Sequence, residues 1–286
     1  MRTVISASRR TDIPGFYMRW LENRIRQGGV EVRNPVVKDR TYHVSLRPED
    51  VHTIVLWSKN FQPFLDSPLS RDPRYRWYFN FSLVDCPEWE RGAPPLDERL
   101  RQAREIAERW SPHHINWRFD PIVFWEGGRR TNVVSFQPIG DVMGELGVSR
   151  CTISFVTWYN KVTKREAVRE LDYYDPPPAQ KLDIASRLSA FARERGMTLA
   201  SCSNDALLAA EGVEKGRCID GKLLSELAGE RCSLARDGSQ RSDCGCTKSS
   251  DIGGYQMSCP HNCLYCYAKP VETPQLIHSS PRAERA

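Results

Sequence analysis

The chain has 286 residues, 40% of them hydrophobic and 10% aromatic, which suffices for one large α/β domain with a sizeable core. Its formal charge of +5 comes from interspersed basic and acidic residues, a balance that permits nucleic-acid binding without requiring it. No stretch approaches the roughly 18 apolar residues of a membrane span, and the start lacks the apolar core of a signal peptide. We therefore expect a cytoplasmic protein with no membrane partner.

Short apolar runs alternate with helical periodicities along the chain. The expected strands cover residues 3–8, 41–46, 51–57, 75–84, 114–119, 151–157 and 198–203. The expected helices run from Pro14 to a stop at Gly28, and over 96–110, 139–146 and 180–195. Such alternation is typical of parallel βαβ units.

The number of these units predicts an α/β fold, specifically a closed or partial (β/α) TIM-type barrel with a carboxy-terminal iron-sulfur cluster loop. A doubly wound sheet is the alternative, which periodicity alone does not exclude. We expect one domain over residues 1–272, with a cluster-binding region at 202–268. The tail 273–286 has few apolar residues and is expected to be disordered.

In a barrel the chemistry is built at the carboxyl ends of the strands. The polar residues expected there are Ser8, Arg9, Arg10, Asp12, Ser58, Lys59, Asn60, Asn80, Ser82, Arg118, Asp120, Ser154, Thr157, Cys202 and Ser203. Arg9 and Arg10 either bind an anion, since Arg suits carboxylate recognition, or include a buried ion-pair partner, with Asp12 as the acid. Arg118 and Asp120 form either a salt bridge or a substrate clamp.

Three cysteines stand at a three-then-two spacing in Cys259-Pro-His-Asn-Cys263-Leu-Tyr-Cys266. A 4Fe-4S cluster normally takes four thiolates, so three leave one iron open to another ligand. Zinc is the alternative, with Cys244 or Cys246 completing a tetrahedral set; unligated or disulfide-forming thiols are a third possibility. His261 lies inside the loop and is either a further ligand or, as we expect, a solvated loop residue.

Ten cysteines in a cytoplasmic chain indicate metal ligands or free thiols more than disulfides. Cys202, Cys218, Cys244 and Cys246 stand in polar contexts and are candidate ligands of a second cluster. Alternatively some of them are merely packed, or one supplies the fourth ligand of the first cluster. Cys86 and Cys151 lie beside or within apolar runs and are expected to be buried and inert. Cys232 falls in the charged segment 230–242, which is expected to be mobile, and it is not among the candidate ligands.

The residues Cys259, Cys263, Tyr265 and Cys266 resemble the cluster loop of the radical S-adenosylmethionine superfamily, and Tyr265-Cys266-Tyr267 resembles that of spore photoproduct lyase. Most of the chain also resembles a family catalogued as a domain of unknown function. The marks of that family are Ser6-Ala-Ser8-Arg9-Arg10-Thr-Asp12-Ile-Pro14 and Cys244-Gly-Cys246…Ser250-Asp251-Ile252-Gly253. In the superfamily the cluster loop follows the first strand, whereas here it follows nearly all other elements.

The superfamily resemblance implies S-adenosylmethionine as a cofactor and hydrogen abstraction from a substrate that the sequence does not identify. It also implies an electron donor such as a flavodoxin or ferredoxin. Two other classes stay open. One is an iron-sulfur electron carrier or cluster enzyme that does not use S-adenosylmethionine. The other is a metal-stabilised nucleic-acid-binding or repair protein in which tryptophans and arginines stack on bases.

Overall fold

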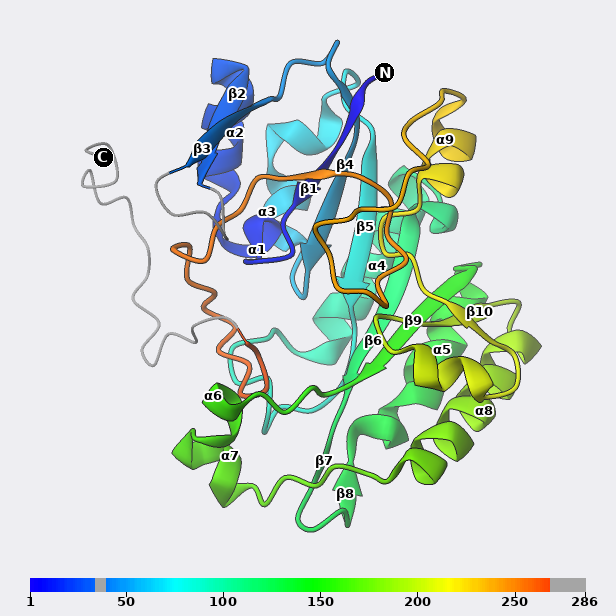
Figure 1. The fold of residues 1–286 in the computed structure, drawn as a ribbon. Coiled ribbons are helices and arrows are strands. Elements are labelled where there is room, and N and C mark those ends of the chain that lie inside the picture. The colour runs from blue at the N-terminus through cyan, green and yellow to red at the C-terminus, as the bar shows by residue number, and fades with distance from the viewer. Residues whose placement is uncertain (34–39, 268–286) are drawn as a thin grey trace.

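The computed structural model describes residues 1–33 and 40–267; the tail 273–286, expected to be disordered, lies outside the described residues. Its centre is a parallel sheet of eight strands (Figure 1). The strands are β1 (Thr3–Ala7), β4 (Val51–Ser58), β5 (Trp77–Ser82), β6 (Ile115–Ile122), β9 (Arg150–Phe155), β10 (Thr198–Ser201), β11 (Val213–Lys215) and β12 (Ser250–Asp251). The protein is therefore an α/β protein, as predicted.

The strands follow one another across the sheet in the order β11-β10-β9-β6-β5-β4-β1-β12. A doubly wound sheet would place half of its strands on the far side of β1, where only the two-residue β12 is found. In the described part of the chain, β11 and β12 each pair with one neighbour and form the two edges. The sheet is thus sequentially wound and open between these edges.

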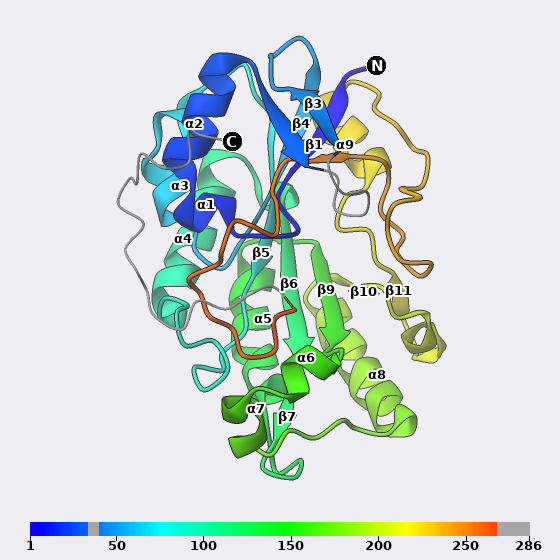
Figure 2. The same ribbon diagram turned by 60° about the vertical axis from the view of Figure 1, so that its left-hand side comes forward.

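Helices lie mainly along one side of the sheet. They are α1 (Ile13–Phe16), α2 (Met18–Gln27), α3 (Gln62–Asp66), α4 (Leu96–Arg109), α5 (Phe136–Glu145), α6 (Asn160–Thr163), α7 (Glu166–Glu170), α8 (Pro178–Glu194) and α9 (Gly221–Ala228). Four 3-10 turns cover Pro68–Arg71, Pro112–His114, Asn132–Ser135 and Asp205–Ala209. Figures 1 and 2 show α3, α4, α5 and α8 along one side of the sheet, while the segment after α9 crosses its opposite face.

The two faces of the sheet differ in chemistry because successive side chains of a strand point to opposite faces. Toward the helices, Ile54, Phe79, Trp117 and Ile153 are fully buried in the main core. We call the opposite face the inner face. The side chains that point to it from the amino-terminal parts of the strands are apolar. Val4, Val55 and Tyr78 pack there against Ile219 and Leu224.

The inner face becomes polar toward the carboxyl ends of the strands. The side chain of Thr152 donates a hydrogen bond to Asn116 at 2.8 Å, and Asn116 donates to Asn80 at 2.7 Å. Asn80 in turn donates to the backbone carbonyl of Cys218 at 3.0 Å. This buried ladder satisfies its own polar groups and marks the transition from the apolar core to a cavity.

The structure corrects several predicted elements. The helix predicted from Pro14 is broken at Tyr17 into α1 and α2, and α1 is capped by the Asp12 side chain. The strand predicted at 41–46 is β3 (Thr41–Ser45), which pairs antiparallel with the unpredicted β2 (Gly29–Arg33) outside the main sheet. A second hairpin joins β7 (Phe124–Trp125) and β8 (Arg130–Thr131). The strand β12 is too short to produce a sequence pattern.

Candidate functional site

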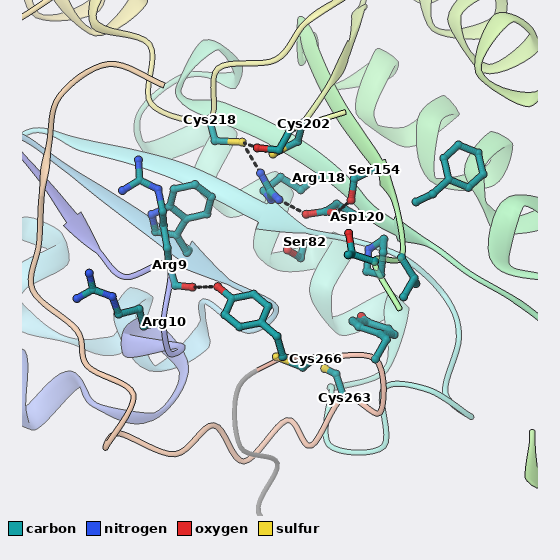
Figure 3. Close-up of a pocket in the computed structure, with 18 of the residues that line it drawn as sticks. Arg9, Arg10, Ser82, Arg118, Asp120, Ser154, Cys202, Cys218, Cys263 and Cys266 are labelled. Atoms are coloured by element: carbon teal, nitrogen blue, oxygen red, sulfur yellow. Dashed lines mark hydrogen bonds and ion pairs between the residues drawn. The ribbon is translucent and has the colours of Figure 1, made fainter. Parts of the chain in front are cut away.

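A cavity of about 710 Å³ opens at the carboxyl ends of the parallel strands (Figure 3). Most of the predicted strand-end residues line it, together with all seven cysteines proposed as metal ligands. These residues are Ser8, Arg9, Arg10, Asp12, Ser58, Lys59, Ser82, Arg118, Asp120, Ser154, Thr157, Cys202, Ser203, Cys218, Cys244, Cys246, Cys259, Cys263 and Cys266. Asn60 and Asn80 are not part of its lining.

Asp12 joins three parts of the site. Its carboxylate caps α1 by accepting a hydrogen bond from the Gly15 backbone N–H at 2.7 Å. It also accepts from the Ser58 hydroxyl at 2.8 Å and from the Lys59 backbone N–H at 3.1 Å, both at the end of β4. His261 Nε2 lies 2.8 Å from the same carboxylate. Asp12 therefore anchors the cysteine-bearing segment to the sheet.

Asp251, which sequence reasoning did not select as a site residue, is the acid that faces Arg9 and Arg10. It accepts hydrogen bonds from the Ser6 and Ser8 hydroxyls at 2.9 and 2.6 Å and from the Arg9 backbone N–H at 2.9 Å. Both guanidinium groups lie 3.9 Å from its carboxylate. The interpretation of Asp12 as the partner of these arginines is therefore wrong, since β12 places Asp251 beside β1 instead.

The arginines differ in their further contacts. Arg10 donates to the Gly253 carbonyl at 2.9 Å, and Gly253 must lack a side chain because a Cβ there would lie 2.2 Å from the Ser8 hydroxyl. Arg9 lies over the Trp57 ring at 5.3 Å, and its Nη2 is buried without a hydrogen-bond partner among the described residues. Burial acts to lower the pKa of Arg9, but nearby Cys246 and Asp251 raise it.

Arg118 and Asp120 form an ion pair that faces the cavity, and the Ser154 hydroxyl donates to the same carboxylate. Arg118 also donates to the Cys218 sulfur and lies over the Trp57 ring at 5.1 Å. Burial alone would lower the pKa of Arg118, but interactions with Cys218, Cys202 and Cys246 raise it. The predicted salt bridge thus exists, and it also links a strand end to a cysteine.

The cysteine loop, residues 259–267, is held by contacts from several segments. The Tyr17 hydroxyl donates to the Ser258 carbonyl at 2.5 Å, and Arg165 donates to the Cys266 carbonyl at 2.8 Å. The Leu264 backbone N–H donates to the Trp89 carbonyl at 2.9 Å. These contacts, which are all made by protein groups, fix the path of the loop.

His261 is not the solvated loop residue that the sequence analysis expected. It is 2% exposed, and its Nδ1 lies 3.0 Å from the Gly92 carbonyl while Nε2 faces Asp12. Gly92 approaches the loop so closely that a Cβ would lie 2.4 Å from the Pro260 carbonyl. Sequence reasoning missed this because the partners lie about 170 and 250 positions away.

A buried ionic network that the sequence did not predict lies behind the loop. Glu90 is 3% exposed; it pairs with Lys59 at 2.6 Å and Arg99 at 3.5 Å, and accepts from the Tyr265 hydroxyl. Burial would raise the pKa of Glu90, but Lys59 and Arg99 lower it. Backbone pairing of Glu90 with Cys263 adds a direct link to the loop.

Burial dominates the chemistry of the loop thiols. It raises the pKa of Cys259 to about 12, with Asp12 adding to the effect. It also raises the pKa of Cys263, to which the charges of Cys266 and Cys259 contribute. A cation or cluster bound at the loop would reverse this effect, because metal coordination deprotonates thiols.

Cys202, Cys218, Cys244 and Cys246, which we call the four-cysteine group, all line the cavity. Figure 3 shows Cys202 and Cys218 across the cavity from Cys263 and Cys266. The sulfur of Cys218 lies 3.8 Å from that of Cys202, and Cys246 interacts with the thiols of both Cys218 and Cys244. The pKa of Cys202 falls to about 6, first because Cys218 donates a hydrogen bond to it and also because Arg118 lies nearby.

The remaining cysteines lie away from the cavity lining. Cys86 and Cys151 are buried, as predicted. Cys232 is also 2% exposed and packs beside the four-cysteine group; the segment 230–242 around it is tied down, for example by the Asp237 backbone N–H, which donates to the Cys246 carbonyl at 2.9 Å.

No disulfide joins the cysteines within the described ranges. In residues 1–33 and 40–267, no three His, Cys, Asp or Glu side chains are arranged to hold a single metal ion. Four tryptophans are buried, namely Trp77, Trp89, Trp117 and Trp125, and the other four pack against the core. Of these four, Trp57 and Trp158 also line the cavity. No helix of the described residues has the length and hydropathy of a membrane span.

Together, the fold and the site define an α/β protein with a cysteine-lined cavity at the carboxyl edge of a parallel sheet. A family model, the domain of unknown function DUF1848, matches residues 4–268. The chain belongs to this family. A search of curated proteins finds no match.

Proposed function

We propose that this protein is an iron-sulfur enzyme of the radical S-adenosylmethionine type, built on a partial β/α barrel. The observation that carries the proposal is that the loop with Cys259, Cys263 and Cys266 lines the same cavity as the polar carboxyl ends of the strands. The sequential strand order supports a barrel-like wall, in which active sites lie at that end.

Three loop thiols would suit a 4Fe-4S cluster with one open iron. Cys259, Cys263 and Cys266 would hold it, since three thiolates supply three of the usual four ligands. When bound and reduced, the cluster would supply one electron to cleave S-adenosylmethionine into methionine and a 5'-deoxyadenosyl radical, which takes a hydrogen atom from the substrate to give 5'-deoxyadenosine.

The protein's own part is to position ligands and exclude water. Arg9 and Arg10 share the carboxylate of Asp251, and both line the cavity. Arg9 Nη2 lacks a hydrogen-bond partner in the described structure. A carboxylate of S-adenosylmethionine or of the substrate would supply one, because guanidinium groups bind carboxylates in pairs of hydrogen bonds.

The test is anaerobic reconstitution with iron and sulfide, followed by electron paramagnetic resonance of the reduced protein with and without S-adenosylmethionine. We expect the added S-adenosylmethionine to change the signal and to be converted to methionine and 5'-deoxyadenosine. Cys263→Ala should lose both effects, whereas Cys151→Ala, which replaces a buried cysteine that does not line the cavity, should keep them.

Two outcomes contradict the proposal. A cluster whose signal ignores S-adenosylmethionine, with no 5'-deoxyadenosine formed, would leave an electron-carrying or structural cluster. Stoichiometric zinc in place of iron would overturn the cofactor assignment itself.

A further inference from the structure

The four-cysteine group is assembled by the fold from separate segments. Cys202 follows β10, Cys218 follows β11, and Cys244 and Cys246 lie between α9 and β12. The sulfurs of Cys202 and Cys218 are 3.8 Å apart, and Cys246 interacts with Cys218 and Cys244. Four thiols from three segments thus line one cavity.

Simple packing does not account for the surroundings of these thiols. A buried inert cysteine behaves as a small apolar side chain, and its neighbours are normally apolar. Here the Arg118 guanidinium donates to the Cys218 sulfur, the Ile219 backbone N–H donates to Cys246 at 3.4 Å, and Arg9 lies beside Cys246. Each guanidinium also faces a carboxylate, Asp120 for Arg118 and Asp251 for Arg9. Positive charge is therefore already held in place beside the sulfurs, where it would stabilise thiolates or an anionic cluster.

We propose that Cys202, Cys218, Cys244 and Cys246 bind a second 4Fe-4S cluster, at a site separate from the 259–267 loop. This inference does not depend on whether S-adenosylmethionine binds the first cluster. Four cysteines complete the ligand set of such a cluster, so no iron is left open and the site transfers electrons or supports the fold rather than binding substrate.

The cavity gives the cluster the space that it needs. Each of the four cysteines lines the cavity, so the sulfurs can move apart to bind separate irons at the corners of a cube. Hydrogen bonds to the cluster sulfurs and nearby charge are known means of setting a cluster potential. Arg118 and Arg9 are placed to act in this way.

The decisive experiment separates the two sets of cysteines. The triple variant C259A/C263A/C266A removes the loop ligands, and C202A/C218A/C244A/C246A removes the four-cysteine group. After anaerobic reconstitution, iron, sulfide and zinc are measured per chain. We expect about eight irons in the wild type and about four in either variant, since each cube holds four; Cys151→Ala should match the wild type.

The outcomes distinguish this inference from the proposed function. A triple variant that keeps about four irons, with a resonance signal indifferent to S-adenosylmethionine, supports the second cluster even if the wild type never cleaves S-adenosylmethionine. A triple variant without iron, beside a wild type with about four irons, overturns the inference. One zinc ion per chain of the triple variant, in place of iron, also overturns the inference.

A measurement on the wild type covers the case of variants that do not fold. Cysteine alkylation is mapped by mass spectrometry in reconstituted protein and after removal of iron by a chelator. We expect Cys202, Cys218, Cys244 and Cys246 to be protected only when iron is bound, with Cys151 unchanged in both states. Equal labelling of the four with and without iron, or disulfides among them in anaerobic protein, contradicts the proposal.

Discussion

The two groups of cysteines face the same cavity but are built differently. The loop thiols lie within eight positions of one another, and burial raises the pKa of Cys259 and Cys263. The four-cysteine group gathers residues from three segments, and two arginines lie beside it. Hydrogen bonds among these thiols lower the pKa of Cys202 and Cys246 and raise that of Cys218 and Cys244. The loop is therefore a compact unit fixed by its neighbours, whereas the four-cysteine group exists only once the fold is complete.

The largest expected loss of stability comes from breaking the ionic network behind the loop. This change should affect the loop cysteines more than the four-cysteine group. Glu90→Ala leaves Lys59 and Arg99 buried without their carboxylate, which typically costs about 3–5 kcal/mol. We expect chemical denaturation to show a loss of this size, and iron analysis to show loss of the loop cluster before that of the four-cysteine group. The control Glu105→Ala breaks surface pairs with Arg101 and Arg109 and should cost less than about 1 kcal/mol. Equal costs for both variants would contradict this view of the network.

A smaller destabilisation is expected from a change in the segment that connects the two groups of cysteines along the chain. Asp251 lies between Cys246 and Cys259 in the chain, and hydrogen bonds to a charged group are worth about 1.5–3 kcal/mol each. Asp251→Asn removes the charge that Arg9 and Arg10 share, so we expect about 2–3 kcal/mol of destabilisation and reduced iron at both sites. Asp66→Asn, an exposed change on α3, serves as the control in thermal unfolding and iron assays. Iron loss confined to one site would show that this segment does not couple them.

The smallest effect concerns the four-cysteine group alone. Arg118→Gln removes a positive charge and changes a hydrogen bond at Cys218, and reduction of a cluster adds negative charge. We expect the potential of the second cluster to fall by on the order of 50 mV, with iron content retained, in an anaerobic redox titration. In Arg118→Gln, the potential of the loop cluster should not change. In the control Arg187→Gln, a substitution at an exposed position, both potentials should match the wild type. An unchanged potential of the second cluster in Arg118→Gln would exclude tuning by Arg118.

The difference between the two groups also explains what could be read from the sequence. The loop spacing and the polar strand ends were visible because period-2 patterns and short spacings are local. Arg118 and Asp120 were identified as a pair for the same reason, since they share one strand.

The contacts that organise the site are instead long-range. Asp251 stands in a segment that carries part of the family resemblance. Only the pairing of β12 with β1 reveals its hydrogen bonds to Ser6, Ser8 and Arg9. Glu90 gives no periodic signal at all. His261 looked solvated because its charged partner, Asp12, lies at the other end of the chain.

The pairing of β1 with β12 has a consequence for folding. Ser6 and Asp251 are separated by 245 positions, so one edge of β1 has no partner until residue 251 has been synthesised. Unpaired strand edges template aggregation, and contacts of such sequence separation form slowly. The residues that close this edge also connect the two groups of cysteines in the chain. If both groups bind clusters as proposed, metal insertion would follow completion of the sheet rather than guide it.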